Sequence, residues 1–281
     1  MQQKLKVTHY DMNPGNCNLR IALVADLHDA DGTQLLRLLE QEKPDLILAA
    51  GDIIERHDRN YAGWNEEKEK EMRSNMGKRT PVDSFMWTIE CLFAPDKRQT
   101  TNIPTNNGME FLQRARDIAP VYYSVGNHEW YLTQKDYQIL SESGVVVLNN
   151  ADCEAQISGR NMKIGGFPIR YDMDWLREFS KKDGCKFLIC HNPEFYKNLI
   201  RSTDLDTFDL IVCGHYHGGH WRIFNRGVYV PRVGLMVKET VGKFDRMVIT
   251  AGVASPTRLP RFRNPCELVI LSPGADTASG R

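Results

Sequence analysis

Short, unbroken runs of apolar residues recur along the chain, and each run ends in polar residues. The five clearest runs lie at 20–26, 45–52, 121–128, 186–192 and 209–217. Continuous rather than alternating hydrophobicity is typical of strands that are buried on both faces. The pattern therefore predicts a sheet that is covered by helices.

Amphipathic segments with helical spacing lie between these runs, at 33–42, 108–119, 133–143 and 195–202. Repeated alternation of strand and helix favours an α/β architecture with largely parallel central strands. Near the C-terminus the pattern changes, because three strand-like segments follow one another with turn residues and no helix between them. These segments, 227–235, 246–252 and 266–272, predict antiparallel strands that complete a sheet.

One segment, 55–107, interrupts this alternation. It is highly polar and contains the charge run NEEKEKEMR at 65–73, although residues 82–93 are apolar enough to predict a buried helix. A solvated insertion is one interpretation. A small cap over a functional site is the other, because long insertions in compact domains are often functional.

Composition and charge narrow the class of protein. The 281 residues are 41% hydrophobic and 26% charged, with a formal net charge of zero. This composition is typical of a soluble globular protein, and no overall basic or acidic excess points to nucleic acid or to a cationic partner. The sequence shows no signal-peptide pattern and no membrane-spanning window, and its seven cysteines form no CxxC pair. We expect a reducing, cytoplasmic setting.

Candidate chemistry gathers where the apolar runs end. The runs are followed in turn by Asp26-Leu27-His28, Gly51-Asp52, Gly126-Asn127-His128-Glu129, His191-Asn192 and Gly214-His215-Tyr216-His217. A single Asp or His at such a position is more often a cap or a turn former. Five strand ends in succession, at the sheet edge where α/β proteins bind ligands, instead predict a metal site. Carboxylate, amide and imidazole donors without thiolate suit Mn, Fe or Zn rather than a cysteine-rich structural zinc site.

The order D-x-H, G-D, G-N-H-E, H and G-H-x-H resembles the calcineurin-like metallophosphoesterase superfamily. The continuation GHYHGG at 214–219 and the segment PRFRNPCELVIL at 260–271 resemble a bacterial, phosphodiesterase-like branch. The resemblance covers most of the chain but not 55–107. Two positions depart from many relatives of that branch, which have Gln in place of His220 and proline in place of Cys266. Neither position is a ligand in the family, so the departures concern substrate preference.

The resemblance implies the fold and the metal ligands. The fold would be a four-layer α/β/β/α sandwich forming one domain over residues 1–281, with mixed central sheets and the insertion at 55–107. One metal would be held by Asp26, His28, Asp52 and His217, and the other by Asp52, Asn127, His191 and His215. Asp52 would bridge two ions that lie roughly 3.5–4 Å apart in such sites.

The resemblance also implies a reaction. A hydroxide bridging the two metals would attack phosphorus in line, and the metals would neutralise phosphate oxygens. His128 resembles the family's non-ligating histidine, which protonates the leaving oxygen or stabilises the transition state. We expect a phosphodiesterase acting on a small-molecule phosphoester. The alternatives are a phosphomonoesterase, a nucleotide-diphosphate pyrophosphohydrolase and an inactive scaffold of the same fold. The sequence specifies neither the substrate nor the oligomeric state.

Several nearby residues are weaker candidates. His220 is a candidate substrate contact. Asp29 and Asp31 are interpreted as helix-capping or solvated carboxylates before ligands. His9 and His57 lie outside the converging blocks and are predicted to be surface residues. Two further groups could serve either the substrate or the fold: the arginines Arg222, Arg232, Arg261 and Arg263, and the aromatic residues Trp130, Tyr131 and Trp221.

Overall fold

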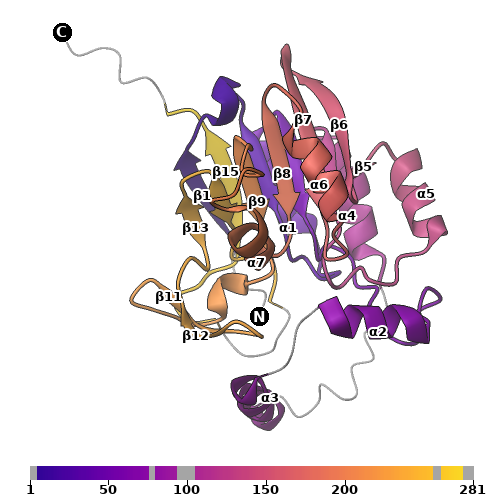
Figure 1. The fold of residues 1–281 in the computed structure, drawn as a ribbon, viewed down its shortest axis with the longest axis vertical. Helices are drawn as coiled ribbons and strands as arrows, with labels where there is room; N and C mark the ends of the chain where they lie inside the picture. Colours follow the sequence, from indigo (N-terminus) through magenta and orange to yellow (C-terminus); the bar gives the residue numbers. More distant parts are fainter. Residues whose placement is uncertain (1–4, 76–79, 94–104, 256–260, 275–281) are drawn as a thin grey trace.

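The computed structural model describes residues 5–75, 80–93, 105–255 and 261–274. Two mixed six-stranded sheets form the centre of the molecule (Figure 1). The first has the order β1-β15-β2-β3-β4-β5. Its strands are β1 (Lys6–Asp11), β2 (Ile21–Val24), β3 (Leu46–Ala50), β4 (Val121–Ser124), β5 (Val146–Val147) and β15 (Glu267–Ser272). The strands β2 to β5 run parallel, whereas β15 is antiparallel to β2 and parallel to β1.

The second sheet has the order β13-β14-β9-β8-β7-β6. Its strands are β6 (Ala151–Ile157), β7 (Arg160–Phe167), β8 (Lys186–Cys190), β9 (Leu210–Cys213), β13 (Gly242–Phe244) and β14 (Met247–Ile249). The four central strands, from β14 to β7, are parallel, and both edge pairs are antiparallel.

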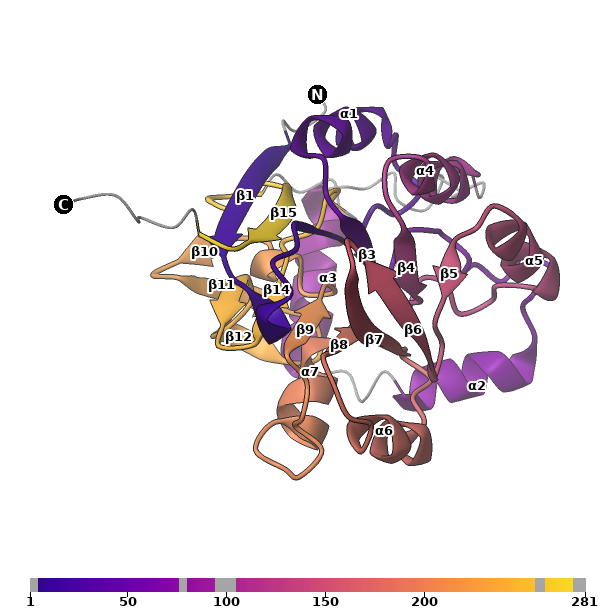
Figure 2. The same cartoon turned by 90° about the horizontal axis from the view of Figure 1, so that it is seen from above.

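Helices cover the outer face of each sheet (Figure 2). The first sheet is covered by α1 (Thr33–Glu42), α4 (Asn107–Arg116) and α5 (Gln134–Glu142). The second is covered by α6 (Met173–Ser180) and by α7 (Pro193–Phe195), which continues as a π-helical turn over Tyr196–Ile200. The predicted four-layer α/β/β/α sandwich is therefore confirmed.

The core explains why the strands are apolar on both faces. Successive side chains in a strand point to opposite faces. In β2, Ile21 and Leu23 pack between the two sheets, while Ala22 and Val24 pack against the helices of the first sheet. All four side chains are fully buried. The unbroken hydrophobic run was therefore a valid sign of a strand covered on both sides.

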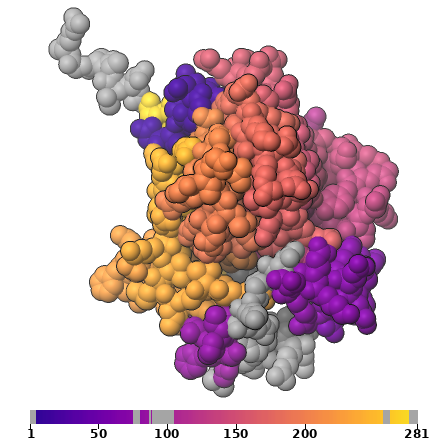
Figure 3. All heavy atoms as spheres, in the orientation of Figure 1, coloured from indigo at the N-terminus to yellow at the C-terminus, as the bar shows by residue number. Residues whose placement is uncertain are grey.

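Three elements lie beyond the sandwich, at the end where β8 and β9 terminate (Figures 1 and 3). One is a small antiparallel sheet of β10 (Arg222–Ile223), β11 (Arg226–Val230) and β12 (Gly234–Val237). The others are α2 (Glu66–Asn75) and α3 (Pro81–Phe93), both within the segment 55–107. The apolar run at 82–93 does form a helix, and within it Phe85 is not buried but exposes 64% of its surface.

Other sequence-based expectations also need correction. The C-terminal segments do not complete one antiparallel sheet, because β11 and β12 form the separate small sheet and β14 runs parallel to β9. The charge run at 65–73 lies largely within α2, where Glu69 accepts hydrogen bonds from Arg59 and Arg73. The predicted helix at 195–202 is mostly a π-helical turn.

Candidate metal centre

The five strand ends converge on one edge of the sandwich. The residues that follow β2 and β3 turn sharply there, and Asp26, His28 and Asp52 all have left-handed backbone angles, with φ of 59°, 52° and 53°. His215 and His217, after β9, do the same, with φ of 69° and 46°. Non-glycine residues rarely adopt this conformation, and such strain concentrates at functional sites.

Two glycines allow the strand ends to approach closely. A side-chain carbon on Gly51, whose φ is +82°, would lie 2.5 Å from Nδ1 of His191. A side-chain carbon on Gly126 would overlap Oδ1 of Asp52 and lie 2.8 Å from Cε1 of His191. Both positions therefore require glycine for the donor atoms to meet.

The predicted ligands form two groups of donor atoms, which we call the ligand clusters. The first contains Asp26, His28 and His217, and the second contains Asp52, His191 and His215. Within each cluster the donor atoms lie within 4.8 Å of one another. Nε2 of His28 is 3.3 Å from Nε2 of His217, and Nε2 of His191 is 3.2 Å from Nδ1 of His215.

Asn127 joins the second ligand cluster, since its Oδ1 lies 3.2 Å from Nε2 of His191. Oδ2 of Asp52 lies 3.3 Å from the same nitrogen. The structure thus brings all seven predicted ligands to one place, with Asp52 grouped with His191 and His215.

The donor set fits metal ions. Asp26 and Asp52 expose only 0% and 1% of their surface. Among the described residues, the ion pairs made by these two carboxylates involve histidines and no lysine or arginine. Two buried carboxylates without a lysine or arginine partner are costly, and imidazole nitrogens converge beside them. Bound cations would offset the buried negative charge and would take the imidazole nitrogens as ligands.

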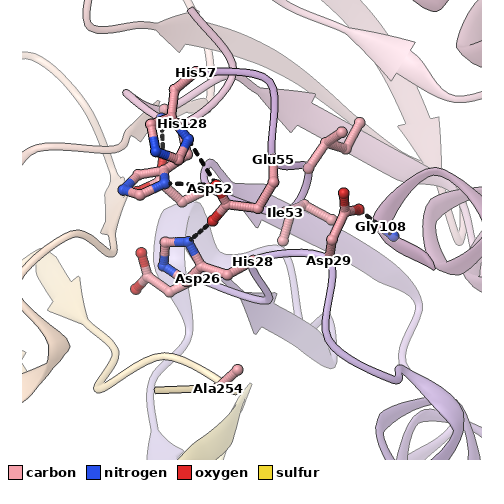
Figure 4. A network of polar contacts seen from close by, with 12 residues as sticks. Asp26, His28, Asp29, Asp52, Ile53, Glu55, His57, Gly108, His128 and Ala254 are labelled. Atoms are coloured by element: carbon pink, nitrogen blue, oxygen red, sulfur yellow. Dashed lines mark hydrogen bonds and ion pairs between the residues drawn. The ribbon is translucent and has the colours of Figure 1, made fainter. Parts of the chain in front are cut away.

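Glu55 is a site residue that sequence reasoning missed. Oε1 of Glu55 lies 2.6 Å from Nδ1 of His28, and Oε2 lies 3.0 Å from Nδ1 of His128. Oε2 also lies 2.7 Å from Nδ1 of His57 (Figure 4). We call Glu55 with these three histidines the Glu55 network. Its carboxylate orients a predicted metal ligand and the predicted acid at the same time.

His57 was predicted to be a surface residue outside the site, and its side chain is 36% exposed, but it lies beside the site. Besides its contact with Glu55, its ring centroid lies 4.3 Å from that of His128 in an edge-to-face arrangement. His57 follows the strand end by only a few residues, so the turn after β3 returns it to the site. His9 is indeed at the surface, where its side chain is 51% exposed and pairs with Glu42.

Glu129 is a buried residue that binds the backbone of the loops carrying the predicted ligands. Its carboxylate accepts backbone hydrogen bonds from Asp52 at 2.8 Å, Ile53 at 2.6 Å, Ile54 at 2.9 Å and Gly126 at 2.5 Å. Burial, together with the nearby Asp52, raises the pKa of Glu129 to about 7. The last residue of the G-N-H-E block thus fixes the loops after β3 and β4 relative to each other.

The electrostatic environment raises the pKa of some histidines at the site and lowers the pKa of others. Burial lowers the pKa of His128, but the carboxylates of Asp52 and Glu55 outweigh it and raise the pKa to about 9. In the same way, Asp52 outweighs burial at His191 and raises its pKa to about 10. Burial and the neighbouring His191 lower the pKa of His215 to about 3, and burial with His28 lowers that of His217. A bound cation would favour the neutral form of every histidine ligand.

Two of the weaker candidates have a structural role. Asp29 accepts a hydrogen bond from the backbone of Gly108 in the first turn of α4, and its Oδ2 lies 3.1 Å from Nη1 of the buried Arg56. Asp31 accepts hydrogen bonds from the backbone and hydroxyl of Thr33 at the start of α1. Each carboxylate thus accepts a hydrogen bond from an amide in the first turn of a helix, although the N-cap residues of these helices are Gly32 and Asn106.

The arginine and aromatic candidates differ in their contacts and in their exposure to solvent. Arg261 donates to the backbone carbonyls of Ala251 and Ala254, and its Nη2 lies 3.3 Å from Nδ1 of His217. Trp130 and Tyr131 are buried, with exposures of 4% and 1%, whereas Trp221 is 38% exposed. The carbonyl of His220 accepts a hydrogen bond from Asn264, and its role in binding substrate stays a prediction.

A cavity of about 650 Å³ lies beside the loop that carries Asn127 and His128. Its lining includes Trp64, Lys68, Glu129, Trp130 and Arg170. No helix in the described part of the chain is long and apolar enough to cross a membrane.

The two-sheet sandwich and the carboxylate and imidazole donors gathered at its edge define a class of proteins with a candidate metal centre at the ends of the strands. A family model described as calcineurin-like phosphoesterase matches residues 19–219, and the chain belongs to that family. The resemblance inferred from the five sequence blocks is thereby confirmed.

Two curated relatives come from Bacillus subtilis (strain 168). The uncharacterized metallophosphoesterase YkoQ is 27% identical over 190 residues, which cover 64% of this chain and 63% of the relative. The uncharacterized protein YpbG is 32% identical over 115 residues, which cover 39% of this chain and 43% of the relative. In both cases the match therefore spans less than two thirds of the relative's length.

Among solved structures, the NAD nucleotidase of Haemophilus influenzae is 14% identical, with a TM-score of 0.40. The match covers 91% of this chain and 45% of that chain. A TM-score this low carries no information about substrate.

Proposed function

We propose that this protein is a dinuclear-metal phosphoester hydrolase that cleaves a small-molecule phosphodiester. The observation that carries the proposal is the pair of adjacent ligand clusters, each built from one buried carboxylate and two histidines. One cluster alone would suit a single ion. Two clusters side by side suit two ions bound to one phosphate group.

In this proposal, Asp26, His28 and His217 hold one ion, and Asn127, His191 and His215 hold the other. Asp52 is shared between them. This agrees with its position, since Oδ2 lies 3.3 Å from His191 and its backbone carbonyl accepts a hydrogen bond from the amide of His28 at 2.9 Å. When bound, Mn, Fe or Zn ions supply Lewis acidity to the phosphate and activate water for in-line attack.

His128 is the proposed acid. Its backbone amide donates to Oδ1 of Asp52 at 2.8 Å, which holds the residue against the second ligand cluster. Its side chain is 24% exposed, so Nε2 can reach a bound substrate, while Nδ1 faces Glu55. Glu55 thereby stabilises the protonated form, which donates its proton to the leaving oxygen.

The test measures metal content and turnover in parallel. The purified protein, loaded with Mn²⁺, should contain two metal ions per chain by elemental mass spectrometry and should hydrolyse bis(p-nitrophenyl) phosphate. His128→Ala should retain both ions and lose about 10²–10⁴-fold in kcat. His9→Ala, a change at an exposed histidine, is the matched control and should behave as wild type. Loss of the metals in His128→Ala, or unchanged turnover, would contradict the assigned role.

The substrate class is tested with the same protein. Phosphomonoesters, cyclic nucleotides and nucleotide-diphosphate conjugates should be cleaved more slowly than diesters if the proposal is correct. Faster cleavage of a monoester or of a pyrophosphate would instead support one of the alternatives. A metal-loaded protein without turnover on any of these substrates would support the scaffold interpretation. A cytoplasmic location is part of the same proposal.

We further propose that the insertion at 55–107 caps the site of a single domain. Its described parts are fastened to both flanks of the metal centre. In α2, the carbonyl of Lys68 accepts a hydrogen bond from Trp130 at 2.8 Å, and Glu71 pairs with Arg170. In α3, Asp83 accepts hydrogen bonds from the hydroxyl of Tyr229 at 2.7 Å and from the backbone of Arg232 at 2.8 Å. Deletion of 60–104 should change KM more than metal content.

A further inference from the structure

Exposed apolar side chains are concentrated on the small sheet of β10, β11 and β12. Most of the large apolar residues that are exposed in the described part of the chain lie there or beside it: Trp221, Ile223, Phe224, Val233, Leu235, Met236 and Phe262. Their exposed fractions range from 37% for Val233 to 88% for Phe224. Soluble proteins rarely leave so many neighbouring apolar side chains in water without a partner.

Phe224 is the most unusual of these residues. It and Asn225 form the two-residue turn between β10 and β11, since Ile223 pairs with Arg226. Both turn residues have left-handed backbone angles, with φ of 49° for Phe224 and 60° for Asn225. Such turns strongly favour Asn, Asp and Gly, because a bulky side chain is strained there. A phenylalanine that is both strained and almost fully exposed indicates a binding role.

The same stretch is strongly cationic, although the whole chain carries no net charge. Residues 220–238 contain no aspartate or glutamate but include Arg222, Arg226, Arg232 and Lys238. Arg263 lies next to this stretch, with its guanidinium 5.4 Å from the ring centroid of Phe262. Within the described residues, Arg226, Lys238 and Arg263 form no ion pair. Three cations, Arg226, Lys238 and Arg263, thus lie among the exposed apolar groups without an ion-pair partner in the described part of the chain.

The exposed apolar groups lie along β12, in the turns of the small sheet, and on the neighbouring Phe262. The helix α3 packs against β12, and its Asp83 accepts a hydrogen bond from the Tyr229 hydroxyl, yet Leu235 and Met236 on β12 remain 55% and 38% exposed. The sheet projects from the sandwich as a lobe (Figures 1 and 3). Aromatic residues with flanking cations are preferred at a lipid interface, and anionic lipid complements the positive charge of this lobe.

We propose that β10, β11 and β12, together with Phe262 and Arg263, form a docking surface for a bilayer of anionic phospholipids. Phe224 and its apolar neighbours enter the headgroup region, and the cations contact lipid phosphates. This inference goes beyond the proposed function, since binding to lipid requires no turnover.

The docking surface is continuous with the metal centre. The short turn His217–Gly219 leads from a predicted ligand directly into β10. Asn264 donates to the carbonyl of His217 at 2.6 Å, and the backbone of Arg222 donates to the carbonyl of Phe262 at 3.0 Å. A bilayer bound at this surface would therefore lie beside the ligand clusters.

The first experiment is cosedimentation of the metal-loaded protein with large unilamellar vesicles. One set consists of phosphatidylcholine alone, and the other contains phosphatidylglycerol at roughly a third of the lipid. We expect strong binding only to the anionic set, weakening with added salt. Lys238→Glu should weaken binding about fivefold or more, because each cation near an anionic surface contributes to affinity. Lys135→Glu, which changes an exposed lysine on α5, is the matched control and should bind as wild type.

The second experiment tests insertion. Phe224→Ala should weaken binding about tenfold, as expected for an aromatic side chain that leaves an apolar environment. Val146→Ala, at an exposed apolar residue on β5, is its control. In Phe224→Trp, the tryptophan emission should shift to shorter wavelength on addition of anionic vesicles.

Two results would overturn the proposal. The first is equal binding to both vesicle types, or to neither. The second is a concentration-dependent dimer, measured by light scattering, that Phe224→Ala abolishes while vesicle binding is absent; this would assign the surface to self-association. Neither result bears on metal content or on hydrolysis of a soluble diester, so failure here is distinct from failure of the proposed function.

Discussion

The ligand clusters and the Glu55 network lie side by side but are built differently. In the clusters, each carboxylate is fully buried and meets several donors, and every donor follows the end of a strand. In the network, a single carboxylate serves three histidines, and Glu55 and His57 belong to the turn after β3 rather than to a strand end. His28, Glu55 and His128 also bring donor atoms within 4.8 Å of one another. In our proposal the clusters hold the cations, and the network holds side chains in position.

In our proposal this difference separates metal binding from proton transfer. His28 belongs to both regions, since Nε2 faces His217 while Nδ1 faces Glu55. His128 belongs to the network through Nδ1, while its backbone amide donates to Oδ1 of Asp52 and its Nε2 lies 3.9 Å from Oδ2 of the same carboxylate. Changes in the clusters should therefore remove metal, whereas changes in the network should slow the reaction in a protein that still holds metal.

The largest effect is expected at Asp52. Asp52→Asn removes the negative charge of the second ligand cluster. The histidines of that cluster, His191 and His215, are then left without a carboxylate partner. We expect at least one metal ion to be lost and hydrolysis of bis(p-nitrophenyl) phosphate to fall by more than about 10³-fold. Elemental mass spectrometry and initial rates measure both quantities.

The control for this prediction is Asp136→Asn. Asp136 is also a buried carboxylate, but it caps α5 and lies outside both regions. That variant should lose stability and keep its metals. Full metal content in Asp52→Asn would remove the basis for treating the two regions as different.

A smaller effect is expected at Glu55. Glu55→Gln keeps the size of the side chain but leaves one acceptor oxygen for three histidines. Carboxylates that orient metal ligands typically contribute 10- to 100-fold, so we expect kcat to fall by about that factor. KM and metal content should change little, because the cluster donors remain.

Glu69→Gln is the matched control, because Glu69 on α2 also accepts hydrogen bonds from several side chains but lies away from the ligand clusters. Its kcat should equal that of wild type. If Glu55→Gln instead lost metal as readily as Asp52→Asn, Glu55 would have to be counted with the clusters.

The two regions also differ in how far the sequence could predict them. Asp26, Asp52, Asn127, His191, His215 and His217 each follow a buried strand, and parallel strands bring their carboxyl ends to the same edge. Local sequence therefore determined where these ligands meet. The partition into two sheets came from the resemblance, since hydrophobic runs alone cannot tell which strands pair.

Glu55 and His57 carried no comparable signal. They lie in a polar stretch after β3, and only the left-handed turn at Asp52 and the supporting contacts of Glu129 bring them back to the site. The position of Glu55, three residues after Asp52 and next to two buried isoleucines, was the available hint. The strands β6 and β7 were missed for a related reason, because their half-exposed patterns lack an unbroken apolar run.

The finest distinction between the regions is the pKa of His128. In the metal-free protein, the carboxylates of Asp52 and Glu55 raise this pKa from 6.5 to about 9. Since the folded-state value is raised, His128 stabilises the fold below pH 6.5, and that contribution is lost as the pH rises through about 9. Carbon-detected NMR titration of the metal-free protein measures the value directly. Glu55→Gln should lower it, because one of the two carboxylates is then neutral. A pKa near 6.5 in the wild-type protein would mean that Glu55 does not hold the proton on His128, and the acid role would then need another group to support it.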